Sequence, residues 1–347
     1  MKMLFAGKTV SFNRMSSPLR NPVASTPIAR WIAQSLRHHP PRAKSLVMTV
    51  FGDTLAPRGG VVWLGSLISL LSPFGISERL VRTAVYRLTD EGWLEAVRQG
   101  RRSQYHLSAQ GEKRFLRAHQ RVYASPAKQW DGRWTLVQII PGATTAQKSL
   151  LKKELIWEGF AAIAPMLFAY PGEKTEALHE LLQRTRSNKI ATVFSASDMG
   201  LPNSLPLSGL VSTAWSLKET RQSYKKFLSR FENVQQLVSE QKNIHPEDAF
   251  VLRTLLIHDY RRALLTDPHL PNELLDSEWP GNAAYVLSKN IYRKIEHTAD
   301  QQVASILAIE HPKVPPIDAR SQAPPGALKS YCPHERAFTL TPDAPPK

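Results

Sequence analysis

Cysteine, long apolar runs and early acidic residues are all scarce in this sequence. Cys332 is the one cysteine among 347 residues, so no disulfide can form within the chain, as is usual in reducing compartments. No stretch approaches the roughly 18 uncharged apolar residues that a membrane span needs, because Gly, Pro or charge interrupts each apolar run. We therefore expect a cytoplasmic protein with no membrane partner.

Acidic residues are nearly missing from the first third, where Asp53 is the first of them. Residues 1–128 carry 20 Lys and Arg against 6 Asp and Glu, whereas residues 129–347 carry 25 against 23. Lys and Arg side chains that neutralise phosphates gain affinity by releasing counterions. This difference in charge between the two parts predicts a polyanion-binding domain in the first third, followed by globular domains with nearly balanced charge. A membrane surface attracts the same charge, but it usually requires a Lys-rich amphipathic helix as well.

The chain is longer than the usual length of a domain with a single hydrophobic core, so several domains are expected. Local patterns change near residues 44, 129, 210 and 312. Within the first segment, Thr26 and Pro27 favour the start of a short helix that ends at Pro40. The predicted organisation is a basic N-terminal arm (1–43), a DNA-binding domain (44–128), an α+β middle domain (129–209), a helical C-terminal domain (210–311) and a Pro-rich disordered tail (312–347).

Residues 64–111 carry the most informative pattern. Apolar residues at helical spacing precede a Ser-Pro-Phe-Gly turn, and Ser77 then has the side chain of a helix N-cap. At about 100° per residue, the next helix has two faces. Its apolar face contains Leu80, Val81, Ala84, Val85 and Leu88. Its opposite face, with Ser77 at the start, carries the candidate DNA contacts Arg79, Arg82, Thr83, Tyr86 and Arg87, which suit phosphates and guanine edges.

A hairpin is expected directly after this helix. Residues 93–98 and 101–107 have strand character, and Gln99 and Gly100 favour a tight turn between them. The turn would gather Arg98, Arg101 and Arg102 at the tip, where a wing meets phosphates or a narrow minor groove. An ordinary surface helix with solvated arginines is the alternative for the helix alone. The order of helix, turn, basic helix and arginine-tipped hairpin favours a winged helix-turn-helix.

Beyond residue 130 the pattern becomes that of an α+β domain. Strands are expected at 134–140, 161–170 and 189–194, with helices at 144–160 and 175–184 between them. This order predicts a ferredoxin-like domain. Long helical patterns follow at 212–242, 246–265 and 283–309, so the last domain is expected to be mostly helical.

Several runs resemble the PaaX family, repressors of phenylacetate degradation. They are KSLVMTVFGD, GGVVWLGSLISLL, FGISERLVRTAVYRL, GRRSQY, HDYRRALLTDPHLPNELL and WPG, and the resemblance extends from about residue 27 to about 309. It implies a winged-helix domain, a middle domain similar to the CRISPR-associated Cas2 protein, and a helical C-terminal domain. It further implies a homodimeric repressor of phenylacetic acid catabolism genes that binds double-stranded operator DNA and is released by phenylacetyl-coenzyme A.

The segment 258–281 is the candidate effector site. A coenzyme A thioester offers phosphates, which suit paired arginines, and an apolar acyl group, which suits a pocket of Trp and Leu. The expected effector contacts are His258, Tyr260, Arg261, Arg262 and Trp279. A purely structural role for each of them, with Asp259 paired to a neighbouring arginine, is the alternative.

An enzyme is the rival interpretation, because Cas2-like folds include metal-dependent nucleases. That chemistry needs a carboxylate near the end of the first strand, but the strand ends Gln138-Ile139-Ile140-Pro141, and Asp131 precedes it. No Cys/His spacing indicates zinc, and no nucleophile motif is present. We therefore expect no catalytic residue, metal or cofactor.

Overall fold

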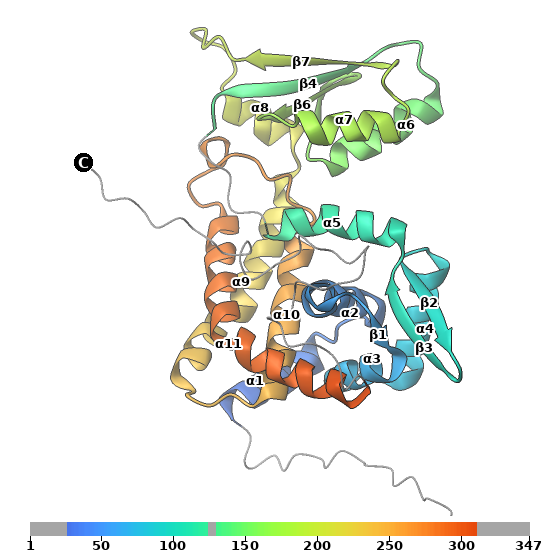
Figure 1. Ribbon diagram of the computed structural model, residues 1–347. Helices are drawn as coiled ribbons and strands as arrows, with labels where there is room; N and C mark the ends of the chain where they lie inside the picture. The colour runs from blue at the N-terminus through green and yellow to red at the C-terminus, as the bar shows by residue number, and fades with distance from the viewer. Residues whose placement is uncertain (1–25, 124–129, 311–347) are drawn as a thin grey trace, which may run out of the picture.

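The computed structural model describes residues 26–123 and 130–310. Figure 1 shows two stacked parts, a sheet domain and a larger body that contains both the beginning and the end of the described chain. The first 25 residues of the expected arm and all of the expected tail lie outside the described residues.

The body begins with α1, Pro27–His38, which the sequence predicted as a short helix inside the basic N-terminal arm. The Thr26 hydroxyl caps this helix by accepting a hydrogen bond from the Ala29 amide at 3.2 Å. Ile28 and Ile32 are buried in the main core. This part of the arm is therefore core structure, because its apolar stripe is covered by helices from the far end of the chain.

The next elements build the basic part of the body. They are α2 (Ala43–Thr49), a π-helix (Val50–Leu55), a 3-10 turn (Ala56–Arg58), β1 (Val62–Trp63), α3 (Leu64–Leu71), a second 3-10 turn (Ser72–Phe74), α4 (Glu78–Asp90), β2 (Leu94–Gln99), β3 (Arg102–Leu107) and α5 (Ala109–Tyr123). The strands form an antiparallel sheet in the order β1-β3-β2. The predicted helix, turn, helix and hairpin are all present in that order.

Two details differ from the sequence prediction. Gly100 and Arg101 form the hairpin turn, one residue later than predicted, because Gln99 still pairs with Arg102; Gly100 takes the positive φ of 62° that favours glycine. Helix α5 was not predicted. Its signal was Ser108, whose hydroxyl accepts a hydrogen bond from the Gly111 amide at 2.9 Å and so caps the helix.

The sheet domain has the predicted ferredoxin-like character, with one more strand than expected. It contains β4 (Arg133–Ile139), α6 (Thr145–Trp157), β5 (Ala161–Ala164), β6 (Leu167–Pro171), α7 (Thr175–Arg184) and β7 (Ala191–Ser197). The strand order is β5-β6-β4-β7, with every neighbouring pair antiparallel. Residues 161–170 were predicted as one strand. They form a hairpin, because Met166 adopts a positive φ of 61° and reverses the chain.

The last elements are helical, as predicted. They are α8 (Leu207–Ala214), α9 (Leu217–Glu240), α10 (Pro246–Leu264), a 3-10 turn (Asn272–Leu274) and α11 (Pro280–Glu310). The long helix expected from residue 212 is interrupted at Trp215, whose backbone is extended and whose side chain is buried. Trp215 leaves the helical path because its ring packs into the apolar cluster under the sheet.

The hydrophobic cores cross the expected domain borders. One continuous core contains residues of α1, α2, α3, α4 and β2 from the first part of the chain. It also contains residues of α9, α10 and α11 from the last part. A second core lies between the sheet and α6 and α7, and a third lies on the other sheet face, where α8 and residues 270–275 cover it. The first and last parts of the chain therefore fold as one body, on which the sheet domain sits.

A buried charge cluster lies inside that body. Arg253 of α10 is 1% exposed and pairs with Asp53 of the π-helix at 3.0 Å and with Asp300 of α11 at 2.5 Å. Arg58 also pairs with Asp300, at 2.6 Å, and Tyr292 donates a hydrogen bond to Asp53 at 3.2 Å. Burial lowers the pKa of Arg253, but the charges of Asp53 and Asp300 outweigh it and raise the pKa above its ordinary value. Arg253 thus stays charged, and the cluster joins three segments distant in sequence.

Candidate nucleic-acid interface and interdomain cavity

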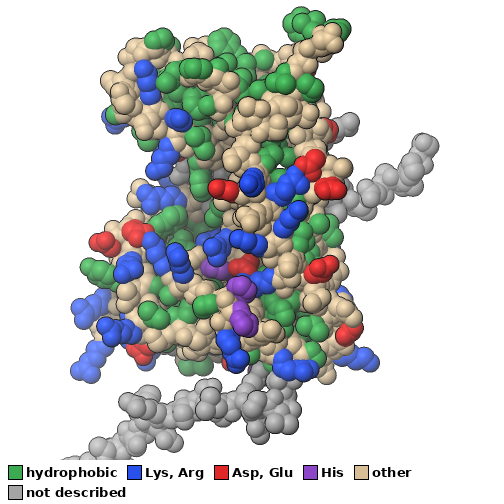
Figure 2. All heavy atoms as spheres, turned by 180° about the vertical axis from the view of Figure 1, so that it is seen from behind, with side chains coloured by type: hydrophobic (Ala, Val, Ile, Leu, Met, Phe, Trp, Pro, Cys, Tyr) green, Lys and Arg blue, Asp and Glu red, His purple; other side chains and the backbone are tan. Residues whose placement is uncertain are grey.

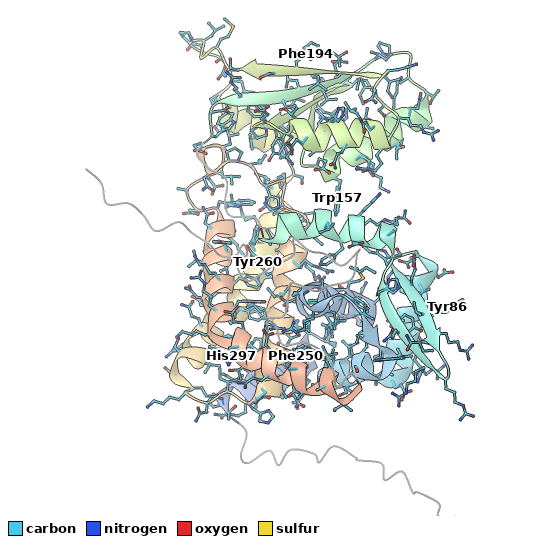
Figure 3. The ribbon with its side chains drawn as sticks, viewed as in Figure 1. Tyr86, Trp157, Phe194, Phe250, Tyr260 and His297 are labelled. Carbon is cyan, nitrogen blue, oxygen red and sulfur yellow. The ribbon has the colours of Figure 1, made fainter. Side chains whose placement is uncertain are left out.

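Helix α4 presents a polar face to solvent, as its periodicity predicted. Its inner face is buried against the body through Val81, Ala84, Val85 and Leu88. The outer face is exposed, and Tyr86, at 72%, is more exposed than the other large hydrophobic side chain on it, Leu80. Figure 3 shows Tyr86 at the outer edge of the body, away from the sheet domain. All five residues predicted on this face are exposed: Arg79, Arg82, Thr83, Tyr86 and Arg87.

Leu80 corrects the prediction, because it lies outside the buried stripe and is 53% exposed. At about 100° per residue, it lies roughly 90° from the centre of the buried stripe. The first turn of α4 therefore leaves this side chain at the rim, where no neighbouring helix covers it.

Local hydrogen bonds organise the start of α4. The Ser77 hydroxyl accepts the Leu80 amide at 3.4 Å, which confirms the predicted N-cap. Arg82 is paired with Glu78 one turn earlier, at 2.7 Å, and both side chains are more than half exposed. The Thr83 hydroxyl donates to the Arg79 carbonyl at 2.9 Å. An exposed pair of this kind is weak, so Arg82 can exchange Glu78 for another anion at little cost.

The hairpin adds a second basic edge. Arg98, Arg101 and Arg102 are all exposed at its tip. The hairpin base is anchored, because Leu94 is buried and Trp93, Tyr105 and Leu107 pack against the main core. Pairing of Val62 with Tyr105 also ties β3 to β1. The body therefore holds the hairpin arginines out beside α4, and Figure 2 shows Lys and Arg side chains gathered over much of the body.

A cavity of about 1420 Å³ separates the sheet domain from the body. The body contributes α2, the π-helix, α5 and the end of α10, whereas the sheet domain contributes α6 and β5. Figure 3 shows Trp157 in the region between the sheet domain and α5. The apolar lining includes Met48, Trp93, Phe115, Ile156, Trp157 and Phe160, and the basic lining consists of Arg42, Lys44, Arg114, Lys153 and Arg261.

The structure separates the residues that were predicted to contact the effector. Arg261 lines the cavity, and Arg262 is exposed beside it in sequence. Tyr260 is 4% exposed and packs against Phe227, and Figure 3 shows it inside the helical part of the body. Trp279 is buried against Tyr224. Tyr260 and Trp279 are thus core residues, and neither is among the residues that line the cavity.

His258 belongs to the junction between α2 and α10. Its Nδ1 lies 3.0 Å from the Thr49 hydroxyl, which itself donates to the Ser45 carbonyl, so Nδ1–H donates to Thr49. Burial, followed by the charges of Arg261, Arg262 and Arg230, lowers the pKa of His258 to about 3. His258 is therefore neutral at physiological pH. Its neighbour Asp259 pairs with Arg230 of α9, as the structural alternative for Asp259 anticipated.

The features of a nuclease centre are not found at the predicted position. Strand β4 carries no carboxylate, and the Asp131 carboxylate accepts the Arg133 amide at 3.0 Å within a turn. Across residues 26–123 and 130–310, no group of three His, Cys, Asp or Glu side chains is placed to hold a metal. Within the same ranges, no helix has the length and apolar content to cross a membrane.

Comparison with known proteins places the chain in a class of three-part proteins with a Cas2-like central domain. Three family models match consecutive regions: PaaX-like protein (42–111), PaaX protein central Cas2-like domain (127–206) and PaaX-like protein C-terminal domain (215–305). The transcriptional repressor PaaX of Escherichia coli (strain K12) is 38% identical over 270 residues, which cover 78% of this chain and 85% of the relative. The chain therefore belongs to the PaaX family.

A solved structure was also found. It is the uncharacterized protein Rv0674 from Mycobacterium tuberculosis, with 21% identity, a TM-score of 0.42 and coverage of 67% of this chain and 89% of the other.

Sequence reasoning missed most of the cavity. Its lining residues come from many elements of both parts, and their side chains meet only after the sheet domain has docked. Among them, Phe115 lies on an amphipathic helix, where a large aromatic residue usually indicates core packing. A lone signal was Gly52, at which an added Cβ would lie 2.5 Å from the Phe115 ring. A glycine inside an apolar helical run indicates such a close approach.

Proposed function

We propose that this chain is a DNA-binding transcriptional repressor that reads its operator through α4 and the β2-β3 hairpin, in the manner of a winged helix-turn-helix. The observation that carries the proposal is the exposed row of arginines on α4 and the hairpin tip, fixed by a buried apolar stripe. The repressor name of the E. coli relative supports it. Such a protein is a regulator and not an enzyme, and it acts in the cytoplasm, where operator DNA is found.

In this proposal α4 enters the major groove, and the hairpin lies over the phosphates or the adjacent minor groove. Arg79, Arg82 and Arg87 supply guanidinium donors for guanine and phosphate, while Tyr86 adds a phenolic hydroxyl and Thr83 adds van der Waals contact. Ser77 lies at the N-terminus of the helix, where its backbone is suited to a phosphate. Arg98, Arg101 and Arg102 contribute sequence-independent affinity.

A homodimer would present two copies of this surface to two half-sites of a palindromic operator. The repressed genes would be those of phenylacetic acid catabolism, which the family resemblance implies.

The interdomain cavity is the proposed effector site, and phenylacetyl-coenzyme A is the proposed effector. Basic side chains from both walls, including Arg42, Lys153 and Arg261, suit the phosphates, and Trp157 and Phe160 suit the aromatic acyl group. The other predicted effector residues would then support the site without lining the cavity. They would do so through packing and charge, and they are His258, Tyr260, Arg262 and Trp279. The ligand releases DNA only if it binds the DNA-free arrangement of the two parts more tightly than the DNA-bound one.

The first test is footprinting on the region upstream of the chain's own gene. We expect protection of a palindromic site, loss of protection with phenylacetyl-coenzyme A, and no effect of free phenylacetate, which has no phosphates. Replacing Arg82 or Arg87 with Ala should weaken operator binding by about 1 to 3 kcal/mol with the far-UV spectrum unchanged. A variant with full affinity would exclude this face of α4 as the reading surface.

The effector site is tested separately with the double variant Arg261→Ala, Arg262→Ala. It should bind the operator normally and ignore the thioester. The matched control is Lys225→Ala, Lys226→Ala, which removes two exposed charges from α9 away from the cavity lining. If the Arg261→Ala, Arg262→Ala variant is still released from DNA by the thioester, the effector binds at another site.

A further inference from the structure

The exposed face of α4 has two edges of different chemistry. Rotation of about 100° per residue aligns Leu80, Thr83 and Arg87 along one edge, at spacings of three and four residues. Arg79, Arg82 and Tyr86 lie along the other edge. The first edge combines an apolar side chain, a threonine and one arginine, whereas the second carries two arginines and a tyrosine.

Internal hydrogen bonds make the first edge more apolar than its sequence suggests. Thr83 directs its hydroxyl to the Arg79 carbonyl, so its methyl group is the part left for an outside contact. Leu80 is 53% exposed although α4 buries a full apolar stripe on its inner side. On the other edge, Arg82 is held by Glu78. The apolar groups thus occupy one side of the first turns of the helix.

We infer that Leu80, with the Thr83 methyl group, recognises the 5-methyl group of thymine in the major groove and so determines specificity at one operator position. This inference rests on the proposed DNA-binding function. In a helix-turn-helix, the N-terminal residues of the second helix contact base edges, and thymine is the base that offers a methyl group there.

The surroundings of Leu80 favour DNA over a protein as the occupant. Leu80 shares its edge of α4 with Arg87, while Arg79 and Arg82 occupy the other edge of the same exposed face. The β2-β3 hairpin, whose tip carries further exposed arginines, lies in the same part of the body (Figure 1). An apolar protein partner would have to cover several exposed cations together with one leucine, at a high desolvation cost. A thymine-containing groove supplies phosphates for the cations and a methyl group for the leucine.

Arg87 extends the inference to a second base of the operator. It lies on the same edge as Leu80, two turns further along α4, and its guanidinium suits the O6 and N7 acceptors of guanine. The edge therefore favours a half-site in which thymine is followed, within a few base pairs, by guanine.

The test uses deoxyuridine, which differs from thymidine only in the missing methyl group. Each thymine of the footprinted site is replaced in turn, and the Kd of the full-length protein is measured for each duplex. For the unmodified protein, we expect at least one thymine whose replacement weakens binding about fourfold, the effect of about 0.8 kcal/mol for one buried methyl-sized group. For Leu80→Ala, the penalty at that position should fall to less than twofold.

The matched control is Leu201→Ala, which removes an equally apolar and similarly exposed leucine (60%) from the sheet domain. It should keep the full deoxyuridine profile of the unmodified protein. Because Leu80 is exposed, its replacement leaves the core intact, and an unchanged melting temperature checks this.

Two results would overturn the inference: a deoxyuridine profile without any sensitive thymine, or one that Leu80→Ala leaves unchanged. Either result is distinct from failure of the proposed function. In that failure the unmodified protein would protect no specific site, and the Arg82 and Arg87 variants would bind like the unmodified chain.

Discussion

The two junctions of this molecule are built in opposite ways. Where α2 and the π-helix meet α10 and α11, the apolar core is continuous and encloses the ion-pair cluster of Arg253, Asp53, Asp300 and Arg58. Where the sheet domain meets the body, an aromatic cluster around Trp134 and Trp215 holds one side, and a cavity of about 1420 Å³ occupies the other.

This contrast indicates which part of the molecule is suited to move. Separating α10 from the π-helix would expose several charges that now satisfy one another, and that cost is large in a dry interior. Tilting the sheet domain would open or close a space that is already hollow, beside the apolar cluster around Trp134 and Trp215. An effector in the cavity would therefore act on the position of the sheet domain, and the α4 surface would remain part of the rigid body.

The largest expected effect comes from breaking the charge cluster. Replacing Arg253 with Ala leaves Asp53 and Asp300 buried without their main partner, and should lower the free energy of unfolding by about 3 to 5 kcal/mol. Urea denaturation measures this change. Arg82→Ala removes an exposed arginine from an equally short pair and should cost less than about 0.5 kcal/mol. If the two variants lost equal free energy of unfolding, burial would not be what makes the Arg253 cluster important for stability.

Acid should weaken the same junction through His258. Its pKa is lowered to about 3 in the folded protein and is near 6.5 when unfolded, so the unfolded chain binds the proton first as pH falls. Stability is thus complete above pH 6.5 and decreases below it, by about 2 kcal/mol at pH 5 from this histidine. Unfolding curves at pH 7.5 and pH 5 measure the loss.

His258→Gln keeps a polar side chain near Thr49 but removes the titration. The variant should be less stable at pH 7.5 and should show a smaller difference between the two pH values. An undiminished difference would assign the acid sensitivity to groups other than His258. Asp300 is not one of them, because Arg253 and Arg58 lower its pKa, so that its contribution to stability is lost only in more acidic solution than pH 5.

The looser junction should respond to Trp215. Its indole Nε1 donates to the Gly159 carbonyl at 2.9 Å, and Trp215→Phe removes that bond, at a cost of about 1 to 2 kcal/mol. Gly159 itself has a φ of 96°, and an added Cβ there would lie 2.7 Å from the Pro268 carbonyl oxygen, so the backbone that accepts this bond requires glycine. Hydrogen exchange should increase in β5 and β6 while α10 and α11 remain protected. Increased exchange throughout the body would mean that the two parts unfold together.

The smallest effect concerns the hairpin tip. Replacing Arg101 and Arg102 with Ala should weaken binding to all DNA sequences alike and reduce the slope of log K against log salt by about 0.9 for each phosphate that is no longer neutralised. Binding measured at several salt concentrations tests this. An unchanged slope would show that the hairpin points away from DNA, whatever the role of α4.

Much of the fold followed from local patterns. The two faces of α4, the Ser77 cap and the arginine-tipped hairpin depend on residues within a few positions of one another, where helical and strand periodicity apply directly. The errors were local as well. Leu80 lies at the margin of its apolar stripe, and Met166 adopts a conformation that a non-glycine residue seldom takes, so periodicity alone misjudged both.

The candidate effector site shows the limit of sequence reasoning. The chemistry of the sequence pointed to Arg261 and Arg262 as candidate effector contacts. In the structure, however, Tyr260 and Trp279 of the same predicted site are buried in the core. Which face of a mostly buried helix meets a cavity depends on what packs against it, and α10 is buried nearly all round. Its apolar pattern therefore indicates no preferred direction.

By itself, the sequence determined the basic first third, the α4 surface and most of the order of helices and strands, because these depend on composition and short-range periodicity. Only the tertiary structure decided that the two ends of the chain share one core, that Arg253 reaches Thr54 across 199 positions, and that a cavity separates the sheet domain from the body. The physical reason is that buried ion pairs and cavities are properties of surfaces brought together by folding, and their partners leave no periodic trace along the chain.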